Sequence, residues 1–277
     1  MKKVKELFDL KDKVAVITGG GGLLGQKHGE ALAEFGCLPI LVDIDEEKTI
    51  KVAEFIKKEF GVISVAYKCD ITIKKEIEGL RDYILSTFGR IDILINNAAI
   101  DPKVDNSGAE VSFSRLENFN LEQWNKEIAV GLSGAFLCSQ VFGFEMAKRR
   151  RGVIINISSD LGIIAPDQKL YRKEGLPEEK QPVKPVTYSV IKHGLIGLTK
   201  YLATYWADKG IRANTLCPGG IYTNQPDEFV QKISSLIPLE RMANIDEYKA
   251  AIVFLASDSS SYMTGTTLVI DGGRSIL

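Results

Sequence analysis

Short apolar runs alternate along this chain with longer stretches in which apolar residues recur at the spacing of a helix. The short runs are rich in Val, Ile and Leu and are apolar at nearly every position, which is typical of strands buried on both faces. The pattern predicts seven strands, at residues 14–17, 39–42, 63–66, 91–95, 153–157, 211–216 and 267–270. Strands that alternate with helices predict an α/β fold in which helices cover both faces of a parallel sheet.

Two of the intervening helices are long, and we place them at residues 121–148 and 187–207. The pairs Asn120 with Gln123 and Asn244 with Glu247 have the spacing of a capping box, which marks the start of a helix. The chain shows no linker, internal repeat or low-complexity tract. We therefore predict one domain that includes all of residues 1–277.

One polar stretch interrupts the alternation, at residues 167–186, and contains three prolines. A connection this long inside a compact domain is usually either functional or disordered, and the sequence leaves both alternatives open. A second polar connection occupies residues 100–119. The cations of the first stretch, which could reach a phosphate or carboxylate on a substrate, are Lys169, Arg172, Lys173, Lys180 and Lys184.

The net charge excludes several classes of partner. The 277 residues carry a formal net charge of −1, and a value so close to zero gives no strong field to attract nucleic acid or an anionic membrane. The basic run at residues 148–151 is better explained as the solvated end of a helix. We see no apolar run that approaches a membrane span, and the N-terminus lacks the apolar segment of a secretory signal. We therefore expect a cytoplasmic protein with no membrane or nucleic-acid partner.

Cysteine and histidine show no metal-site spacing, and only two histidines occur. We therefore expect neither a metal ion nor a disulfide framework. The residues expected to be free, buried thiols are Cys37, Cys69, Cys138 and Cys217.

A glycine-rich turn at residues 19–25 follows the first strand and begins a helix. Glycines let a pyrophosphate approach the backbone, and the N-terminus of the following helix presents unpaired N–H groups to the anion. The second strand ends at Asp43, roughly 20 residues beyond the glycines, where a carboxylate binds the ribose hydroxyls of NAD and repels the 2′-phosphate of NADP. This spacing predicts a NAD site, and a helix N-cap is the alternative for Asp43.

Tyr188 and Lys192 lie four residues apart in the second long helix. Residues at this spacing project from one face of a helix, within reach of each other. A nearby ammonium favours ionisation of a phenol, whose ordinary pKa is about 10, so such a tyrosine can exchange a proton with a hydroxyl or carbonyl group near neutral pH. Such pairs also arise by chance on amphipathic helices, so the meaning of this one depends on the rest of the chain.

Seven segments together resemble the short-chain dehydrogenase/reductase family. They occur in order at residues 18–25, 70, 96–99, 158–162, 188–192, 214 with 218–220, and 271–273. The resemblance extends from about residue 10 to the end of the chain. It implies a single-domain, Rossmann-type, doubly wound sheet of about seven parallel strands.

The resemblance also implies a role for each matching residue. Ser159 would hold and polarise the reacting oxygen, Tyr188 would transfer its proton, and Lys192 would favour the ionised tyrosine and hold the nicotinamide ribose. Asp70 would contact the adenine, and Asn96 would lie under the cofactor. The residues expected to contact the cofactor are Gly19, Gly22, Leu23, Leu24, Gly25, Asp43, Asp70, Ile71, Asn96, Ala98, Tyr188, Lys192, Pro218, Gly219, Ile221 and Thr223.

Three features depart from the family pattern. Leu23 replaces a glycine of the turn, so the pyrophosphate loop is expected to differ in shape. Trp124 and Gly134 match a segment in which the family has an Asn, but that position is Gly131 here, which puts a water-linked proton relay to the lysine in doubt. The third departure is the 167–186 insertion, which should emerge beside the substrate pocket.

These observations predict a NAD-dependent oxidoreductase that interconverts a secondary alcohol and a ketone by hydride transfer. A weaker resemblance to members from bacterial surface-glycan and nonulosonic-acid pathways implies a sugar, sugar phosphate or nucleotide sugar as the substrate. A 3-oxoacyl thioester reductase is the alternative within enzymes. A dinucleotide-binding regulator without turnover is the alternative from another class, and Gly131 is its best support.

We also expect a homo-oligomer, a dimer or a tetramer, because the family pairs its two long helices across a two-fold axis. The apolar positions on more than one face of these helices include Phe136, Val141, Phe142, Leu195, Leu198, Leu202 and Trp206.

Overall fold

The computed structural model describes residues 3–100 and 114–277, so most of the predicted 100–119 connection lies outside the described residues. Seven parallel strands form one sheet in the order β3-β2-β1-β4-β5-β6-β7. The strands are β1 (Val14–Thr18), β2 (Leu38–Asp43), β3 (Val65–Lys68), β4 (Ile93–Asn96), β5 (Gly152–Ile157), β6 (Ile211–Pro218) and β7 (Thr267–Ile270). The strand order reverses between β1 and β4, which is where doubly wound sheets bind their ligands. The predicted single-domain doubly wound sheet is thus confirmed.

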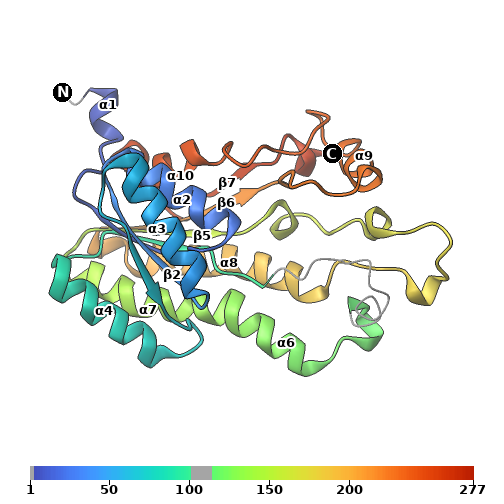
Figure 1. Cartoon of the computed structure of the whole chain (residues 1–277), viewed down its shortest axis with the longest axis horizontal. Coiled ribbons are helices and arrows are strands. Elements are labelled where there is room, and N and C mark those ends of the chain that lie inside the picture. Colours follow the sequence, from blue (N-terminus) through green and yellow to red (C-terminus); the bar gives the residue numbers. More distant parts are fainter. Residues whose placement is uncertain (1–2, 101–113) are drawn as a thin grey trace.

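Helices cover both faces of this sheet (Figure 1). One face packs against α2 (Leu23–Glu34), α3 (Glu46–Phe60) and α10 (Lys249–Ala256), and the other against α4 (Lys74–Phe88), α7 (Gly134–Lys148) and α8 (Val186–Tyr205). The shorter helices are α1 (Val4–Leu7), α6 (Leu121–Ile128) and α9 (Asp227–Ser234). Apolar side chains of strands and helices form one core on each side, and most residues of the five central strands are buried, whereas those of the edge strands β3 and β7 are partly exposed.

The third strand begins two residues later than the pattern predicts. Ile63 is 59% exposed, and the ladder with β2 starts at the pair Ile40 and Val65. Beside Ser64 the neighbouring strand has Pro39, which has no N–H, and the Ser64 hydroxyl donates to the Pro39 carbonyl (3.4 Å). Strand pairing therefore starts beyond the proline.

The predicted helix at residues 121–148 is interrupted in the middle by a π-helical turn, Ala129–Ser133, between α6 and α7. Contrary to the sequence-based expectation, this run is long and apolar enough to cross a membrane by length and composition, with a mean hydropathy of 1.4 over 18 residues. Half of those residues are buried inside the fold, which is typical of the core helix of a globular domain.

The two predicted capping pairs differ in outcome. Asn120 does cap α6, because its side chain accepts from the Gln123 N–H (2.7 Å). At the second pair the Glu247 carboxylate accepts from the Asn244 N–H (2.7 Å), as in a capping box, and also from Arg241. The residues that follow form a turn, however, and α10 begins only at Lys249.

The apolar residues expected at a subunit contact lie mostly in the protomer's own core. Those that are buried are Val141, Phe142, Leu195, Leu202 and Trp206. Phe136 remains 48% exposed, so the two long helices still present apolar side chains outward. The four cysteines are free and buried, as predicted, and burial raises the pKa of the Cys69 thiol to about 12.

Candidate active site

The glycine-rich turn joins β1 to α2 in a conformation that only small residues allow. Gly19 has a φ of +65°, and a Cβ added at Gly25 would lie 2.1 Å from the Gly19 carbonyl oxygen. Gly22 is the N-cap of α2 and offers no side-chain cap to the first amides of the helix. Leu23 is the first helical residue and has no positive φ, so this departure from the family pattern introduces no backbone strain. The turn therefore presents the helix N-terminus to an anion.

Thr18 and Asn97 hold the turn against the end of β4. The Thr18 hydroxyl accepts from the N–H groups of Asn97 (3.0 Å) and Ala98 (3.1 Å), and the Asn97 amide donates to the carbonyls of Thr18 (2.9 Å) and Gly19 (3.2 Å). Sequence reasoning did not assign Asn97 a role, although it stands next to Asn96 in the motif. Its amide supports the backbone that faces the candidate cofactor site.

Asp43 lies at the end of β2, directly beside the glycine turn. Its carboxylate accepts from the Gly21 N–H (3.0 Å) and from the Asp45 N–H (3.1 Å). The N-cap of α3 is Asp45, which accepts from the Lys48 N–H (3.1 Å). The alternative that Asp43 caps a helix is therefore wrong.

The remaining residues predicted near the adenine and under the cofactor lie at the ends of β3 and β4. Asp70 accepts from the Thr72 N–H (2.9 Å) and so closes a turn, and Ile71 next to it is buried. Asn96 is buried, and its amide donates to Asn156 Oδ1 (2.8 Å) and Ser139 Oγ (3.0 Å). Among the described residues no donor reaches the buried oxygen Asn96 Oδ1.

A pair of reciprocal hydrogen bonds joins the end of β5 to α8. Ser158 Oγ donates to the Lys192 carbonyl (2.7 Å), and Lys192 Nζ donates to the Ile157 carbonyl (3.0 Å). A Cβ at Gly162 would lie 2.2 Å from Ser158 Oγ and 2.9 Å from the Lys192 carbonyl oxygen, so only glycine allows this approach. The loop that carries Ser159 is thus fixed against the helix that carries the Tyr188–Lys192 pair.

Ser159 is nearly buried and has a carboxylate for a neighbour. Its hydroxyl donates to Asp160 Oδ1 (2.7 Å) and accepts from the Leu161 N–H (3.2 Å). Asp160 Oδ2 in turn accepts from Arg274 Nη1 (2.8 Å), and both side chains are buried. Because Arg274 follows β7, the C-terminal segment helps to orient the candidate serine. Sequence reasoning missed this pair, whose members are 114 positions apart.

Tyr188 lies on the first turn of α8 between two ammonium groups. Lys192 Nζ is 5.5 Å from the centroid of the tyrosine ring, and Lys184 Nζ is 3.8 Å from it. His193 points elsewhere, since its ring nitrogen Nδ1 contacts the Ser189 carbonyl (2.9 Å) and its side chain is exposed. The helix therefore brings Tyr188 and Lys192 together as the spacing predicts.

Gly131 lies in the π-helical turn, directly against α8. A Cβ at this position would be 2.8 Å from Cγ2 of Ile191, the residue before Lys192. One turn earlier, the buried Glu127 accepts hydrogen bonds from Gln123 (2.5 Å) and from the Thr187 hydroxyl. Ile191 therefore occupies the space that an Asn side chain at position 131 would need.

The segment after β6 forms a closed loop on the other side of the candidate site. Gly219 donates to the Ile270 carbonyl (2.8 Å), and its own carbonyl accepts from the Tyr248 hydroxyl (3.0 Å). Gln225 closes the loop, because its amide donates to the Ile221 carbonyl (2.8 Å) and accepts from the Thr223 N–H (2.7 Å). The loop continues directly from Pro218, the last residue of β6.

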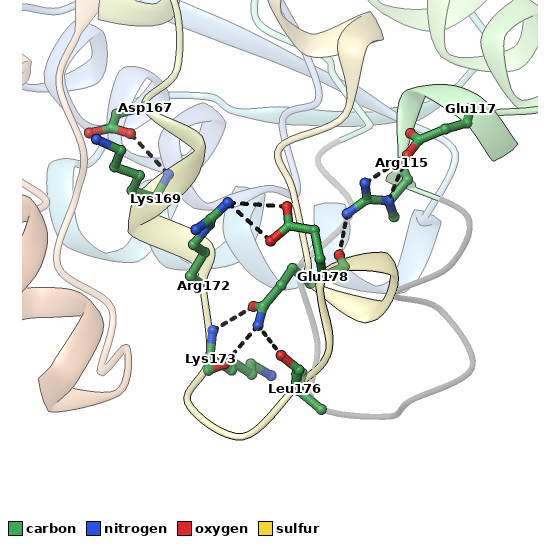
Figure 2. Close-up of polar contacts among 9 residues, drawn as sticks. Arg115, Glu117, Asp167, Lys169, Arg172, Lys173, Leu176 and Glu178 are labelled. Carbon is green, nitrogen blue, oxygen red and sulfur yellow. Dashed lines mark hydrogen bonds and ion pairs between the residues drawn. The ribbon is translucent and has the colours of Figure 1, made fainter.

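The 167–186 insertion is an ordered segment that extends from the body of the molecule beside α9 (Figure 1). Gln181 is buried at its centre, where it accepts from the Lys173 N–H (2.8 Å) and donates to the carbonyls of Lys173 (2.9 Å) and Leu176 (2.6 Å). Figure 2 shows that Arg172 also pairs with Glu178 (3.1 Å) across the same loop. The sequence left a functional and a disordered loop as alternatives, and the structure gives this segment a defined set of contacts.

Two neighbouring segments hold the insertion from opposite sides. Arg115 donates to the Glu178 carbonyl (2.7 Å; Figure 2), and Lys232 of α9 donates to the Arg172 carbonyl (3.0 Å). Leu170 packs with Ile233 in a small apolar cluster against α9. The insertion therefore bridges the 114–119 segment and α9.

Residues 13–171 match the family model described as short chain dehydrogenase, and residues 178–275 match the model described as enoyl-(acyl carrier protein) reductase. The chain belongs to the short-chain dehydrogenase family. It is therefore an oxidoreductase of the kind that binds a nicotinamide dinucleotide.

Members of the short-chain dehydrogenase family align with almost the whole length of this chain. It is 34% identical to an NADP-dependent mannitol dehydrogenase of Alternaria alternata (98% of this chain, 95% of the relative). It is 30% identical to a NAD-dependent glycerol dehydrogenase of Listeria innocua (97% and 96%). A gluconate 5-dehydrogenase of Burkholderia cenocepacia, solved with NADP and tartrate, is 28% identical, with a TM-score of 0.85 over 99% of this chain and 100% of that one.

The residues present fit a nicotinamide dinucleotide. The glycine turn leaves the N-terminus of α2 without a side-chain cap. Within the turn, the backbone of Gly25 lies so close to the Gly19 carbonyl oxygen that a Cβ on Gly25 would clash. Asn96 Oδ1, at the end of β4, is a buried hydrogen-bond acceptor that no donor reaches among the described residues. The acidic Asp43 faces the turn, as expected for the residue that contacts the adenosine ribose.

Proposed function

We propose that this short-chain dehydrogenase interconverts the secondary alcohol of a sugar derivative and the corresponding ketone, with NAD as its preferred cofactor. The observation that carries the proposal is a pair of hydrogen bonds that fixes the Ser159 loop against α8. Ser158 Oγ donates to the Lys192 carbonyl, and Lys192 Nζ donates to the Ile157 carbonyl. Relatives that act on mannitol and glycerol support a polyol-like substrate.

In this proposal each side chain handles the reacting oxygen or its proton. Ser159 hydrogen-bonds the reacting oxygen, and Tyr188 accepts its proton during oxidation and returns it during reduction. Lys192 stabilises the phenolate through its positive charge and holds the nicotinamide ribose. The nicotinamide, when bound, supplies or accepts the hydride. The other contacts to it would come from Gly19, Gly22, Leu23, Leu24, Gly25, Asp43, Asp70, Ile71, Asn96, Ala98, Pro218, Gly219, Ile221 and Thr223.

The finer features of the proposal rest on individual residues. The Asp43 carboxylate would repel the 2′-phosphate of NADP, which supports NAD even though the relatives include users of both cofactors. The insertion beside the candidate site supports a substrate larger than a simple polyol, such as a sugar phosphate or nucleotide sugar of a surface-glycan pathway. We further propose that the enzyme acts in the cytoplasm as a homo-oligomer.

Two other functions compete with this one. The match of residues 178–275 to an enoyl-(acyl carrier protein) reductase model favours an acyl thioester substrate. A regulator without turnover is disfavoured, because Ser159, Tyr188 and Lys192 are all present. Assays with a 3-oxoacyl thioester and NADH, beside the sugar panel, separate these alternatives.

Tyr188→Phe tests the proposed chemistry directly. NADH formation from a panel of polyols, sugar acids and sugar phosphates would first identify a substrate for the wild-type enzyme. Loss of the phenolic proton should then reduce kcat at least about 100-fold, while the affinity for NAD stays nearly unchanged. The control is Tyr262→Phe, because Tyr262 is fully exposed. Near-normal kcat in Tyr188→Phe would refute the mechanism.

A further inference from the structure

The Ser159 hydroxyl belongs to a small set of buried hydrogen bonds. It donates to Asp160 Oδ1 (2.7 Å), and the Leu161 N–H donates both to Ser159 Oγ (3.2 Å) and to Asp160 Oδ1 (2.8 Å). The second carboxylate oxygen, Asp160 Oδ2, accepts from Arg274 Nη1 (2.8 Å). A carboxylate paired with an arginine only accepts hydrogen bonds, so the proton between Ser159 and Asp160 belongs to the serine.

This proton needs a different acceptor in the proposed reaction. There the Ser159 hydroxyl hydrogen-bonds the reacting oxygen of the substrate, so its O–H bond must turn away from Asp160. Rotation about the Cβ–Oγ bond moves the proton and leaves Oγ in place. Asp160 then keeps the Leu161 N–H and the Arg274 guanidinium, so the buried carboxylate does not lose all its partners. The serine can therefore change acceptors without moving its oxygen atom.

A turn after β7 determines where Arg274 lies. The Asp271 carboxylate accepts from the Gly273 N–H (2.9 Å), and Gly273 has a φ of +92°, which favours glycine. A Cβ at Gly273 would lie 2.9 Å from Pro238 Cγ, so the turn packs closely against the segment that contains this proline. Arg274 is itself buried and reaches Asp160 from this turn.

We propose that Asp160 and Arg274 are positioning residues for Ser159. The carboxylate holds the serine oxygen in place, and the arginine holds the carboxylate while the serine proton turns to the reacting oxygen. This inference rests on the proposed function, because it concerns the serine of the same site. On this proposal neither residue contacts the reacting atoms, and both act through Ser159.

Steady-state kinetics of the full-length enzyme test this role, with a substrate identified from the sugar panel. Arg274→Met should reduce kcat about tenfold, because the serine oxygen is no longer held in one position, while the KM for NAD stays within about twofold. Arg274→Lys keeps a cation beside Asp160 and should restore kcat to within about threefold of wild type.

Arg90→Met is the matched control. Arg90 donates twice to the buried Asp92 (2.7 and 2.6 Å), which precedes β4 at the end of the strand opposite Asn96. The variant breaks an ion pair of the same kind away from Ser159, and kcat should stay within about twofold of wild type. A fall in kcat equal to that of Arg274→Met would mean that loss of any buried ion pair has this effect, and would overturn the inference.

A double-mutant cycle then shows whether the arginine acts through the serine. In a Ser159→Ala background, adding Arg274→Met should change kcat by no more than about twofold, because the residue to be positioned is already absent. Single-turnover formation of NADH at high enzyme concentration measures these slow rates. The same tenfold loss with and without Ser159 would overturn the inference. If Arg274→Met does not fold, Asp160→Ala with Arg274→Met removes both charges and takes its place in the cycle.

Crystal structures with NAD test the positioning without turnover. In the wild type, Ser159 Oγ should occupy one position within 3.5 Å of Asp160 Oδ1, and in Arg274→Met it should be displaced or occupy more than one rotamer. An unchanged serine in the variant would overturn the inference.

The outcomes separate this inference from the proposed function. Normal kcat in Arg274→Met, with a low kcat in Ser159→Ala, overturns the positioning role alone. Near-normal kcat in Ser159→Ala refutes the role that the proposed function gives to this serine. A protein that oxidises none of the sugar panel, but whose Ser159 loses its position in Arg274→Met, would refute the proposed substrate and support the positioning role.

Discussion

His28 is a buried imidazole on α2, and neither of its ring nitrogens has a hydrogen-bond partner among the described residues. Burial lowers its pKa from the ordinary 6.5 to about 3. The unfolded chain therefore takes up a proton below pH 6.5, whereas the folded protein does not until near pH 3. The free energy of unfolding must fall as the pH drops through this range.

His28→Leu should remove this pH dependence. Between pH 7 and pH 5 the wild type should lose about 2 kcal/mol of unfolding free energy that the variant keeps, measured by urea denaturation at each pH. His193→Leu is the control, because that imidazole is exposed. Parallel pH curves for the wild type and His28→Leu would contradict the assignment.

Asp43→Ala addresses cofactor choice. It removes a charged acceptor for the adenosine ribose, and about 2–4 kcal/mol of NAD affinity should be lost, with a higher ratio of NADP to NAD use. Because Asp43 also accepts from the Gly21 N–H, part of the lost affinity will come from the turn, so the ratio of kcat/KM values is the decisive measurement. Glu47→Ala removes an exposed acid nearby and should leave the ratio as it was. An unchanged ratio of NADP to NAD use in Asp43→Ala would show that Asp43 does not determine cofactor choice.

Residue-level prediction from the sequence succeeded where the signal is local. The spacing of Tyr188 and Lys192 needs only helix geometry, and the glycine turn needs only a strand before it and a helix after it. The ion pair of Asp160 with Arg274 joins residues 114 positions apart, and no periodicity links them. Contacts of this kind depend on which chain segments the fold brings together.

At the scale of elements, the seam between the π-helical turn and α8 explains the absent Asn. Gly131→Ala should destabilise the protein by about 1–3 kcal/mol, because the new Cβ would lie 2.8 Å from Ile191 Cγ2. In an Ile191→Ala background the same change should cost much less, which denaturant unfolding of the single and double variants measures.

A glycine of α8 provides the control. A Cβ at Gly197 would have no atom within 4 Å, so Gly197→Ala should raise the free energy of unfolding by about 0.5–1 kcal/mol through helix propensity. A comparable destabilisation by both alanines would mean that the contact with Ile191 is not the cause. The sequence showed that Gly131 departs from the family pattern, but only the packing shows why.

The elements themselves were largely predictable, because each strand is a continuous apolar run and each helix keeps its own period. The errors came from neighbours in space. Pro39 delays the start of β3, and the π-helical turn interrupts a helix that the sequence pattern continues from residue 121 to residue 148. The docking of the insertion against α9 also depends on contacts with residues far away in the chain, such as that of Lys232 with the Arg172 carbonyl.

For the whole molecule, the outward face of α7 and α8 carries several aromatic side chains around a groove of about 850 Å³. Tyr201 and Tyr205 stack with ring centroids 5.5 Å apart and are 62% and 60% exposed, and Phe144 is 53% exposed. Water-exposed aromatic clusters of this kind usually mark a protein contact. A two-fold axis through this face would bring the same cluster from each copy together.

We therefore expect sedimentation velocity at micromolar protein concentration to show a dimer or a tetramer and no monomer. The double variant Phe144→Glu with Tyr201→Glu should shift the protein toward monomers, because each two-fold contact would then lose four aromatic side chains and bury four carboxylates in their place. Ile63→Glu places a carboxylate at another exposed apolar position, 59% exposed and just before β3, and should leave the assembly intact. A wild-type protein that sediments as a monomer would show that these aromatic side chains remain in solvent. An assembly that survives the double variant would mean that the copies associate through a different face.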